Sequence, residues 1–244
     1  MATLPAVLSV HAADNLGLEG TTADAGLIAE QQCLPRTIVT AVLAADRVRV
    51  ESIEPVTLTL LAQQFEMVCA GAAPRHGRIG IVRDRQQVRL IAEMIDTYGP
   101  MDLVVAPVVH VGETRVMDDD VLAAIREHLF PRAEVVALRD TDLPAFCGGS
   151  EWETSAIDGA RQLRRMGAAS VVVSGTNARG AATLVLEDRN GHRFHEVPGA
   201  VAGLGATAGM VPATLAAQRA SGLELREAVV ATQHQLGFRL RRGR

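Results

Sequence analysis

The sequence predicts an α/β fold: a three-layer, doubly wound and mostly parallel sheet with helices on both faces, in one domain over residues 1–244. Strand-like and helix-like patterns alternate from one end of the chain to the other, which is typical of repeated βαβ units. Hydrophobic residues make up 48% of the chain but aromatic ones only 3%. A core of Val, Leu, Ile and Ala suits parallel strands that are buried on both faces. No linker or low-complexity segment divides the 244 residues, a length that fits one large domain.

The expected strands are short and rich in β-branched residues. The first, AVLSVH, is followed by a turn-rich loop that reaches Gly20. Near the C-terminal end, Asn190-Gly191 stands between two strand-like runs, which is a strong hairpin signal. The expected strands are 6–11, 37–43, 47–51, 78–82, 102–109, 134–138, 169–174, 182–187 and 193–197.

The expected helices follow from apolar spacing and from capping residues. Thr21 or Thr22 is expected to cap the first helix, and Asp84 the third. Gly167 is expected to end the helix before it. The expected helices are 22–32, 55–70, 85–98, 118–129, one from 150 or 154 to 166, 210–219 and 224–236.

Charge and composition exclude several functions. The net charge of −4 gives no electrostatic case for a nucleic-acid partner. All 24 basic residues are Arg, so lysine chemistry, such as a Schiff base or a Walker-type phosphate lysine, is absent. No apolar run is long enough to span a bilayer, so no membrane partner is expected.

The cysteines indicate a reducing compartment. Cys33, Cys69 and Cys147 are odd in number and widely spaced, which suits neither a disulfide framework nor a zinc site. The N-terminal run lacks the basic residues that begin a signal peptide, and Pro5 interrupts it. The expected location is therefore the cytoplasm, with the thiols reduced.

A stretch of small residues at 197–222 leads into the helix expected at 210–219. Such a loop can bring backbone N–H groups close to an anion, and the helix dipole favours negative charge there. It can equally be a turn that lets a helix pack closely on a sheet. The stretch alone does not decide between a phosphate cradle and a packing turn.

Ligands of doubly wound sheets bind at the carboxyl ends of the strands. Three expected loops at such ends carry unusual residues: 11–20, 107–114 and 175–180. The small-residue loop at 203–209 is expected to join them. The sequence thus predicts one site built from four loops.

The order of motifs resembles the hydroxymethylpyrimidine and phosphomethylpyrimidine kinases of thiamine synthesis and their pyridoxal-kinase relatives, in the ribokinase-like superfamily. HAADNLGLEGTTAD is similar to the loop AGSDxxGGAGIQAD of that family, with Asp14, Gly17, Gly20 and Asp24 in place. RIGIV is similar to the family's KIGML, and ATAG to its GTGC or GTGD cradle. The resemblance runs from about residue 8 to residue 231.

The resemblance implies the site residues. Its substrate side, for a pyrimidine or pyridoxine-like small molecule, would comprise Asp24, Gly20, Asp14, His11, Ala45, Ile81 and Val109. Its nucleotide side, for ATP, would comprise Arg139, Asp142, Ser174, Gly175, Thr176, Gly205 and Ala206. Backbone N–H groups at Thr207, Ala208 and Gly209 would form the catalytic corner, and Asp142 would help to hold Mg²⁺. A homodimer is also implied.

The sequence departs from the family where the chemistry is done. Gly209 stands at the position of the catalytic Cys or Asp, and Ala45 at that of a substrate-binding Gln. Ala106 replaces an Asp and Arg139 an Asn. Two functions therefore stay open. One is an ATP-dependent kinase that acts on the hydroxymethyl or phosphate group of an aminopyrimidine. The other is a catalytically silent member that binds a pyrimidine, a pyridoxine-like ligand or a nucleotide as a sensor or partner subunit.

For three single residues the sequence also allows simpler roles than ligand binding. Asp24 would either contact the ligand or merely favour the start of a helix. Arg139 would either bind phosphate through its planar fork or pair with Asp140 or Asp142. His11 is expected to be a core or ligand-contacting histidine rather than a metal ligand.

Overall fold

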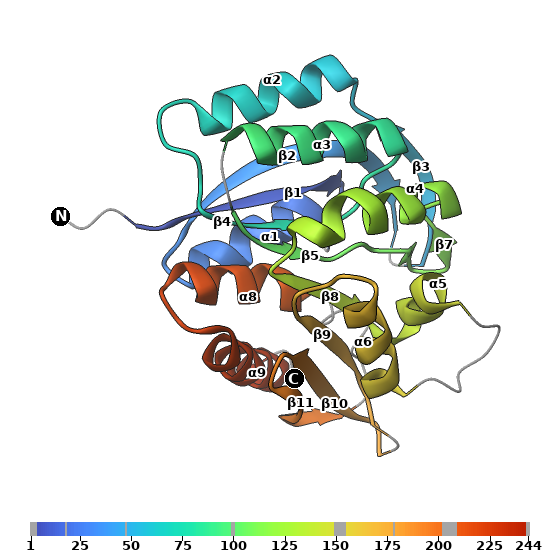
Figure 1. The fold of residues 1–244 in the computed structure, drawn as a ribbon, viewed down its shortest axis with the longest axis vertical. Coiled ribbons are helices and arrows are strands. Elements are labelled where there is room, and N and C mark those ends of the chain that lie inside the picture. Colours follow the sequence, from blue (N-terminus) through green and yellow to red (C-terminus); the bar gives the residue numbers. More distant parts are fainter. Residues whose placement is uncertain are drawn as a thin grey trace.

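Figure 1 shows the computed structural model of the chain. It describes residues 4–17, 19–46, 48–98, 101–148, 155–177, 179–201 and 209–242, with the backbone alone for 198–201 and 240–242.

The strands and helices alternate along the chain as the sequence predicts. The strands are β1 Ala6–Asp14, β2 Leu34–Ala45, β3 Val50–Pro55, β4 His76–Ile79, β5 Asp102–Val105, β6 His110–Val111, β7 Thr114–Arg115, β8 Val135–Arg139, β9 Val171–Thr176, β10 Ala181–Asp188 and β11 Gly191–Val201. The helices are α1 Gly20–Glu30, α2 Leu58–Cys69, α3 Arg85–Tyr98, α4 Asp119–Ala124, α5 Leu143–Cys147, α6 Ala156–Arg165, α8 Met210–Ala220 and α9 Leu225–Arg242. A π-helical turn, Ile125–Leu129, continues α4, and short 3₁₀ turns span Phe130–Arg132 and Asp140–Asp142.

The main sheet has nine strands in the order β11-β10-β9-β8-β5-β4-β1-β2-β3. The strands from β9 to β2 in this order run parallel to one another. The outer strands β3, β10 and β11 pair antiparallel. This mixed, mostly parallel sheet confirms the predicted fold class, and right-handed crossovers account for helices on both faces.

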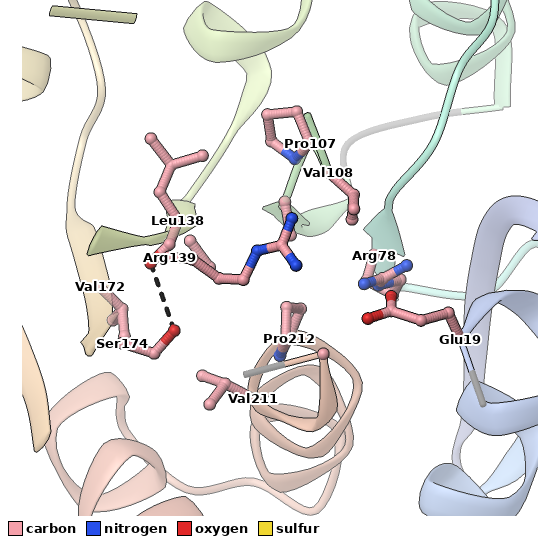
Figure 2. Close-up of a pocket in the computed structure, with 13 residues that line it drawn as sticks. Glu19, Arg78, Pro107, Val108, Leu138, Arg139, Val172, Ser174, Val211 and Pro212 are labelled. Atoms are coloured by element: carbon pink, nitrogen blue, oxygen red, sulfur yellow. Dashed lines mark hydrogen bonds between the residues drawn. The ribbon is translucent and has the colours of Figure 1, made fainter. Parts of the chain in front are cut away.

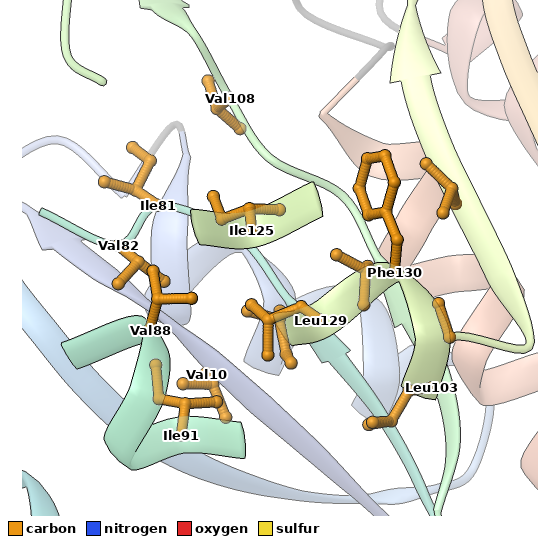
Figure 3. Close-up of a cluster of buried hydrophobic side chains, with 14 of the residues drawn as sticks. Val10, Ile81, Val82, Val88, Ile91, Leu103, Val108, Ile125, Leu129 and Phe130 are labelled. Atoms are coloured by element: carbon orange, nitrogen blue, oxygen red, sulfur yellow. The ribbon is translucent and has the colours of Figure 1, made fainter. Parts of the chain in front are cut away.

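Two apolar layers cover the two faces of the sheet. Neighbouring strand residues point to opposite faces, so Val7 packs with α1, α8 and α9, whereas Leu8 packs with α2 and α3. Figure 1 shows α2, α3 and α4 on one side of the sheet and α8 and α9 on the other. Figure 3 shows part of the first layer, where Val88 and Ile91 of α3 lie near Val10 of β1. Aliphatic side chains dominate both layers, as the composition predicts.

The strand order of the sheet reverses between β1 and β4. Strands β2 and β3 lie on one side of β1, and β4 and the strands of this sheet that follow it in the sequence lie on the other side. Helix α1 packs on one face and α3 on the other. A crevice opens outside the carboxyl ends of the strands at such a switch point, and it is the usual ligand site of doubly wound sheets.

Some element boundaries differ from the predictions. The strand expected at 102–109 ends at Val105, because Pro107 has no N–H to donate to a neighbouring strand. The strand expected at 47–51 lies at Val50–Pro55, and α2 begins after Thr57, whose hydroxyl accepts a hydrogen bond from the Leu60 N–H (3.2 Å). The predicted hairpin is present, with Asp188 paired to Gly191.

Two of the predicted helix caps are confirmed and one is wrong. Asp84 Oδ1 accepts hydrogen bonds from the N–H groups of Gln86 and Gln87, both at 2.8 Å, as predicted. Gly167 comes directly after Met166, the C-terminal cap of α6, with a φ of +109°, also as predicted. The predicted cap Thr21 or Thr22 is wrong, since α1 begins earlier, at Gly20, after Glu19.

Candidate active site

A cavity of about 710 Å³ opens at the switch point of the sheet. Its wall comes from the β1–α1 loop, the first turns of α1, the end of β2, the β6–β7 hairpin, the end of β8, the start of α8 and Arg239 of α9. Asp14, Gly20, Asp24, Ala45, Arg139 and Gly209 all line it. Residues predicted from both the substrate side and the nucleotide side thus share one cavity.

Gly20 fixes the β1–α1 loop against the first strand. Its φ is +78°, and a Cβ there would lie 2.2 Å from the Ala12 carbonyl oxygen. Only glycine therefore allows the loop to approach β1 so closely. The neighbouring Glu19 N–H donates to Asp14 Oδ2 at 3.3 Å. The loop holds Asp14, Glu19 and Gly20 in fixed positions at the cavity wall.

A buried ion pair forms the floor beneath this loop. Asp24 Oδ2 lies 3.2 Å from Arg78 Nη1, and the two side chains are only 2% and 1% exposed. The Ser9 hydroxyl donates to the same carboxylate oxygen at 2.5 Å. Burial raises the pKa of Asp24 and lowers the pKa of Arg78, because each charged form loses its hydration. Asp24 therefore belongs to a buried ion pair and also lines the cavity.

His11 lies in the core behind the cavity wall. Its Nδ1 accepts hydrogen bonds from the N–H groups of Ala12 (2.8 Å) and Ile81 (3.2 Å), which places the ring proton on Nε2. His11, Ile81 and Val109 are buried and do not line the described cavity. Gly80 makes room for the ring, since a Cβ there would lie 2.5 Å from His11 Nε2.

Arg139 reaches the cavity from the end of β8. Its Nε donates to Asp142 Oδ2 at 2.8 Å and its Nη2 to the His110 carbonyl at 2.7 Å. The predicted alternative of an ion pair with Asp142 is therefore present, although the guanidinium still lines the cavity. Asp142 is 2% exposed, and its Oδ1 has no hydrogen-bond partner in the described part of the chain.

The predicted nucleotide residues of β9 lie next to Arg139. Ser174 lines a narrow pocket that adjoins the large cavity, and its hydroxyl donates to the Leu138 carbonyl at 3.4 Å (Figure 2). The Thr176 N–H donates to Asp140 Oδ2 at 3.2 Å. A Cβ on Gly175 would lie 2.3 Å from the same oxygen. Asp140 thus fastens the end of β9 to the end of β8.

Glu19 is a cavity residue that was not among the predicted site residues. It lines both the large cavity and the narrow pocket, together with Arg139 and Gly209 (Figure 2). Burial raises the pKa of its carboxyl, while the positive charge of Arg139 acts in the opposite direction. The signal was in the loop motif itself: a small residue of AGSDxxGGAGIQAD is an acidic one here.

Four predicted positions, Gly205, Ala206, Thr207 and Ala208, lie outside the described residues. Among the described residues, no group of three or more His, Cys, Asp or Glu side chains could hold a metal ion. The described helices include none with the length and hydropathy to cross a membrane.

The chain matches known kinases. Residues 14–240 fit the family described as phosphomethylpyrimidine kinase. The hydroxymethylpyrimidine/phosphomethylpyrimidine kinase of Bacillus subtilis (strain 168) is 27% identical over 173 residues, 69% of this chain but only 63% of that protein. The enzyme of the same name from Rhizobium meliloti (strain 1021) is 27% identical over 248 residues, 94% of this chain and 88% of that protein.

Two solved structures share the fold. A Bacillus subtilis pyridoxal kinase in an ADP complex superposes with a TM-score of 0.84 at 23% identity, covering 95% of this chain and 90% of that one. A phosphomethylpyrimidine kinase from Clostridium difficile 630 superposes with a TM-score of 0.80 at 20% identity, covering 93% and 97%.

Proposed function

The chain belongs to the phosphomethylpyrimidine kinase family, and we propose that it transfers the γ-phosphoryl group of ATP to an aminopyrimidine. The acceptor is the hydroxymethyl group, or the phosphate of the phosphorylated compound. The observation that carries the proposal is the shared cavity. Asp14, Gly20 and Asp24 line it opposite Arg139, and Gly209 at the start of α8 completes it. Its volume of about 710 Å³ suits a small ring together with phosphate groups.

The residues of this cavity fit the phosphate groups of ATP. The Arg139 guanidinium lines both compartments and supplies positive charge. Helix α8 has 11 residues and begins at the cavity wall. The N–H groups of Met210 and Val211 have no acceptor within the helix and so favour an anion, whereas Pro212 has no N–H. Phosphoryl transfer depends mainly on positioning and charge stabilisation, which these groups supply.

Mg²⁺ fits Asp142. Proteins usually hold this ion through one or two carboxylates together with substrate phosphates and waters, rather than in a cage of protein ligands. Asp142 presents one buried carboxylate oxygen, Oδ1, that accepts no hydrogen bond from the described residues and lies 3.7 Å from His110 Nδ1. When bound, the ion would neutralise charge on the phosphates. The proposal therefore includes Asp142 as the protein's contribution to the magnesium site.

A coupled assay of ADP release tests this function. The purified protein is supplied with Mg-ATP and, separately, with hydroxymethylpyrimidine, its phosphate and pyridoxal. Turnover is expected with a pyrimidine acceptor and in excess of ATP hydrolysis without an acceptor. Absence of turnover with all three acceptors would contradict the proposal.

The silent alternative is favoured by one specific observation. Two polar side chains of the family are absent from the cavity wall, where Ala45 and Gly209 stand instead. A silent member would bind a pyrimidine or a nucleotide as a sensor or partner subunit. Calorimetry separates the two proposals, because the silent one requires binding without turnover. The cytoplasmic location and the homodimer remain predictions. Light scattering coupled to size-exclusion chromatography measures the oligomeric state.

A further inference from the structure

The carboxylate of Glu19 fills the space beside Gly209. A Cβ on Gly209 would lie 2.9 Å from Glu19 Oε1 and 3.2 Å from Oε2. Gly209 has a φ of −63°, which any residue adopts, so the backbone does not require glycine there. A side chain at position 209 would have to displace the neighbouring carboxylate. Where position 209 lacks a polar group, position 19 supplies one to the same place.

Glu19 stands where the two compartments of the site meet. It is the acidic residue that lines both the large cavity and the narrow pocket. Asp14 and Asp24 line only the large cavity. Figure 2 shows the side chains of Glu19 and Arg139 pointing into the narrow pocket from opposite sides. A substrate hydroxyl in the large cavity and a phosphate near Arg139 would therefore meet beside Glu19.

The loop fixes the backbone of Glu19 without a hydrogen bond to its carboxylate in the described part of the chain. The backbone of Glu19 is fixed on one side by the hydrogen bond to Asp14 and on the other by the close contact of Gly20 with β1. In the described part of the chain, burial and neighbouring charges shift the pKa of its carboxyl, and no side-chain hydrogen bond contributes to that shift. Such a group is positioned and free to accept a proton.

We propose that Glu19 is the general base of the phosphoryl transfer, delivered by the β1–α1 loop in place of a side chain at position 209. This inference rests on the proposed function. An electron pair of the substrate hydroxyl oxygen forms a bond to the γ-phosphorus of ATP. The bond from that phosphorus to the β–γ bridging oxygen breaks, and its electron pair leaves with ADP. The hydroxyl proton passes to Glu19 and then to solvent.

The surroundings of Glu19 suit this task. Burial raises the pKa of its carboxyl above the ordinary 4.5, and the negative charges of Asp14 and Asp142 act in the same direction. Arg139 opposes them and keeps the carboxylate available as a base. The charged groups around it in the described part of the chain are Asp14 on β1, Asp24 on α1, Arg78 on β4, Arg139 on β8 and Asp142 in the turn that follows. Arg239 on α9, which pairs with Glu30, lines the same cavity. Activity should therefore fall with acid as Glu19 becomes protonated.

Glu19→Gln tests the proposal, because glutamine has nearly the same shape but does not act as a base. We expect kcat with the pyrimidine acceptor to fall about 100- to 10,000-fold, with little change in the KM for ATP. The acid limb of the pH profile should disappear. Glu66→Gln, an exposed position on α2, is the matched control and should leave both unchanged.

Transferring the carboxylate from position 19 to position 209 tests whether Glu19 acts as a base or only supports the structure. Glu19→Ala opens the space beside position 209, and adding Gly209→Asp should raise kcat about tenfold or more above Glu19→Ala alone. Gly209→Asp in the presence of Glu19 should lower kcat, since its Cβ would lie 2.9 Å from a carboxylate oxygen.

The outcomes distinguish the two proposals. An inactive wild-type protein overturns both the kinase function and the role of Glu19. An active wild-type protein whose Glu19→Gln variant is equally active overturns the role of Glu19 alone. A slow Glu19→Gln variant that keeps its acid limb also overturns that role, since Glu19 would then act on the structure only.

Discussion

At the scale of the residue, two acidic groups of the site have different surroundings and different tasks. Asp24 is committed to Ser9 and Arg78 within the floor of the cavity. Among the described residues, the Glu19 carboxylate has no such hydrogen-bond or ion-pair partner, and it faces both compartments. The difference comes from a few residues of sequence, because Glu19 precedes α1 while Asp24 lies on the second turn, facing the sheet. A carboxylate bound in a buried ion pair positions the site, and an unpaired one is available for proton transfer.

Asp24→Asn should therefore affect stability strongly. Above the pKa of Asp24, about 8, the amide leaves the buried Arg78 guanidinium without the counter-charge that Asp24 supplies, and we expect the free energy of unfolding to be about 3–5 kcal/mol below that of wild type. Urea denaturation measures it. The double variant Asp24→Asn with Arg78→Met removes both charges and should recover part of the loss. Full stability of the single variant would show that Arg78 does not depend on Asp24.

At the scale of the element, α8 is held at its C-terminal end by a second ion pair. Arg219 donates from Nε (2.9 Å) and Nη2 (2.6 Å) to Asp102 Oδ2, at the start of β5. Burial acts to raise the pKa of Asp102, but the hydrogen bonds from Arg219 and the nearby His76, whose Nδ1 lies 3.6 Å from Oδ2, outweigh it and lower the pKa. This contact holds α8 along the sheet and so keeps its first turn at the cavity.

Arg219→Met should destabilise the protein in a pH-dependent way. A carboxyl with a lowered pKa contributes stability above its unfolded pKa, near 3.8, and loses it as the pH falls through the folded value. At neutral pH we expect a loss of about 1.5–3 kcal/mol. The difference from wild type should shrink below pH 3.8. Arg36→Met, an exposed position on β2, is the control and should show no pH-dependent difference.

At the scale of the whole molecule, the cavity ties together segments far apart in the sequence. Its wall includes Asp14 near one end of the chain and Met210 near the other. A ligand that binds there stabilises only the fully folded chain. Binding should therefore be visible as a shift of the entire unfolding transition rather than of one part of it.

Saturation with Mg-ATP and a pyrimidine should raise the Tm. At a ligand concentration of about 100 Kd the stabilisation is about 2.7 kcal/mol. A domain of this size gains about 2–4 °C for each kcal/mol, so scanning calorimetry should record an increase of about 5–10 °C. The silent and the active proposals both predict it. No shift with nucleotide, pyrimidine or pyridoxal would contradict ligand binding in either form.

Sequence patterns predicted the architecture well and the chemistry of the site less well. The alternation of strands and helices and the hairpin at Asn190-Gly191 follow from local periodicity and turn chemistry, and both are present. The switch point follows from strand order, which depends on packing over the whole chain. The contact between Glu19 and Gly209 joins positions that no local pattern relates, and it became visible only in three dimensions.

The position of α8 has a consequence for how the protein is made. This helix begins at Met210, yet it packs beneath β1, β4 and β5, which the ribosome completes much earlier. Until α8 emerges, Val104 and the rest of that face of the sheet lack the part of their cover that α8 provides. A chain truncated before residue 210 would present this apolar face to water and would be prone to aggregate. Nascent chains would accordingly depend on chaperones until α8 has been synthesised, because the cavity is incomplete without its first turn and no ligand could bind sooner.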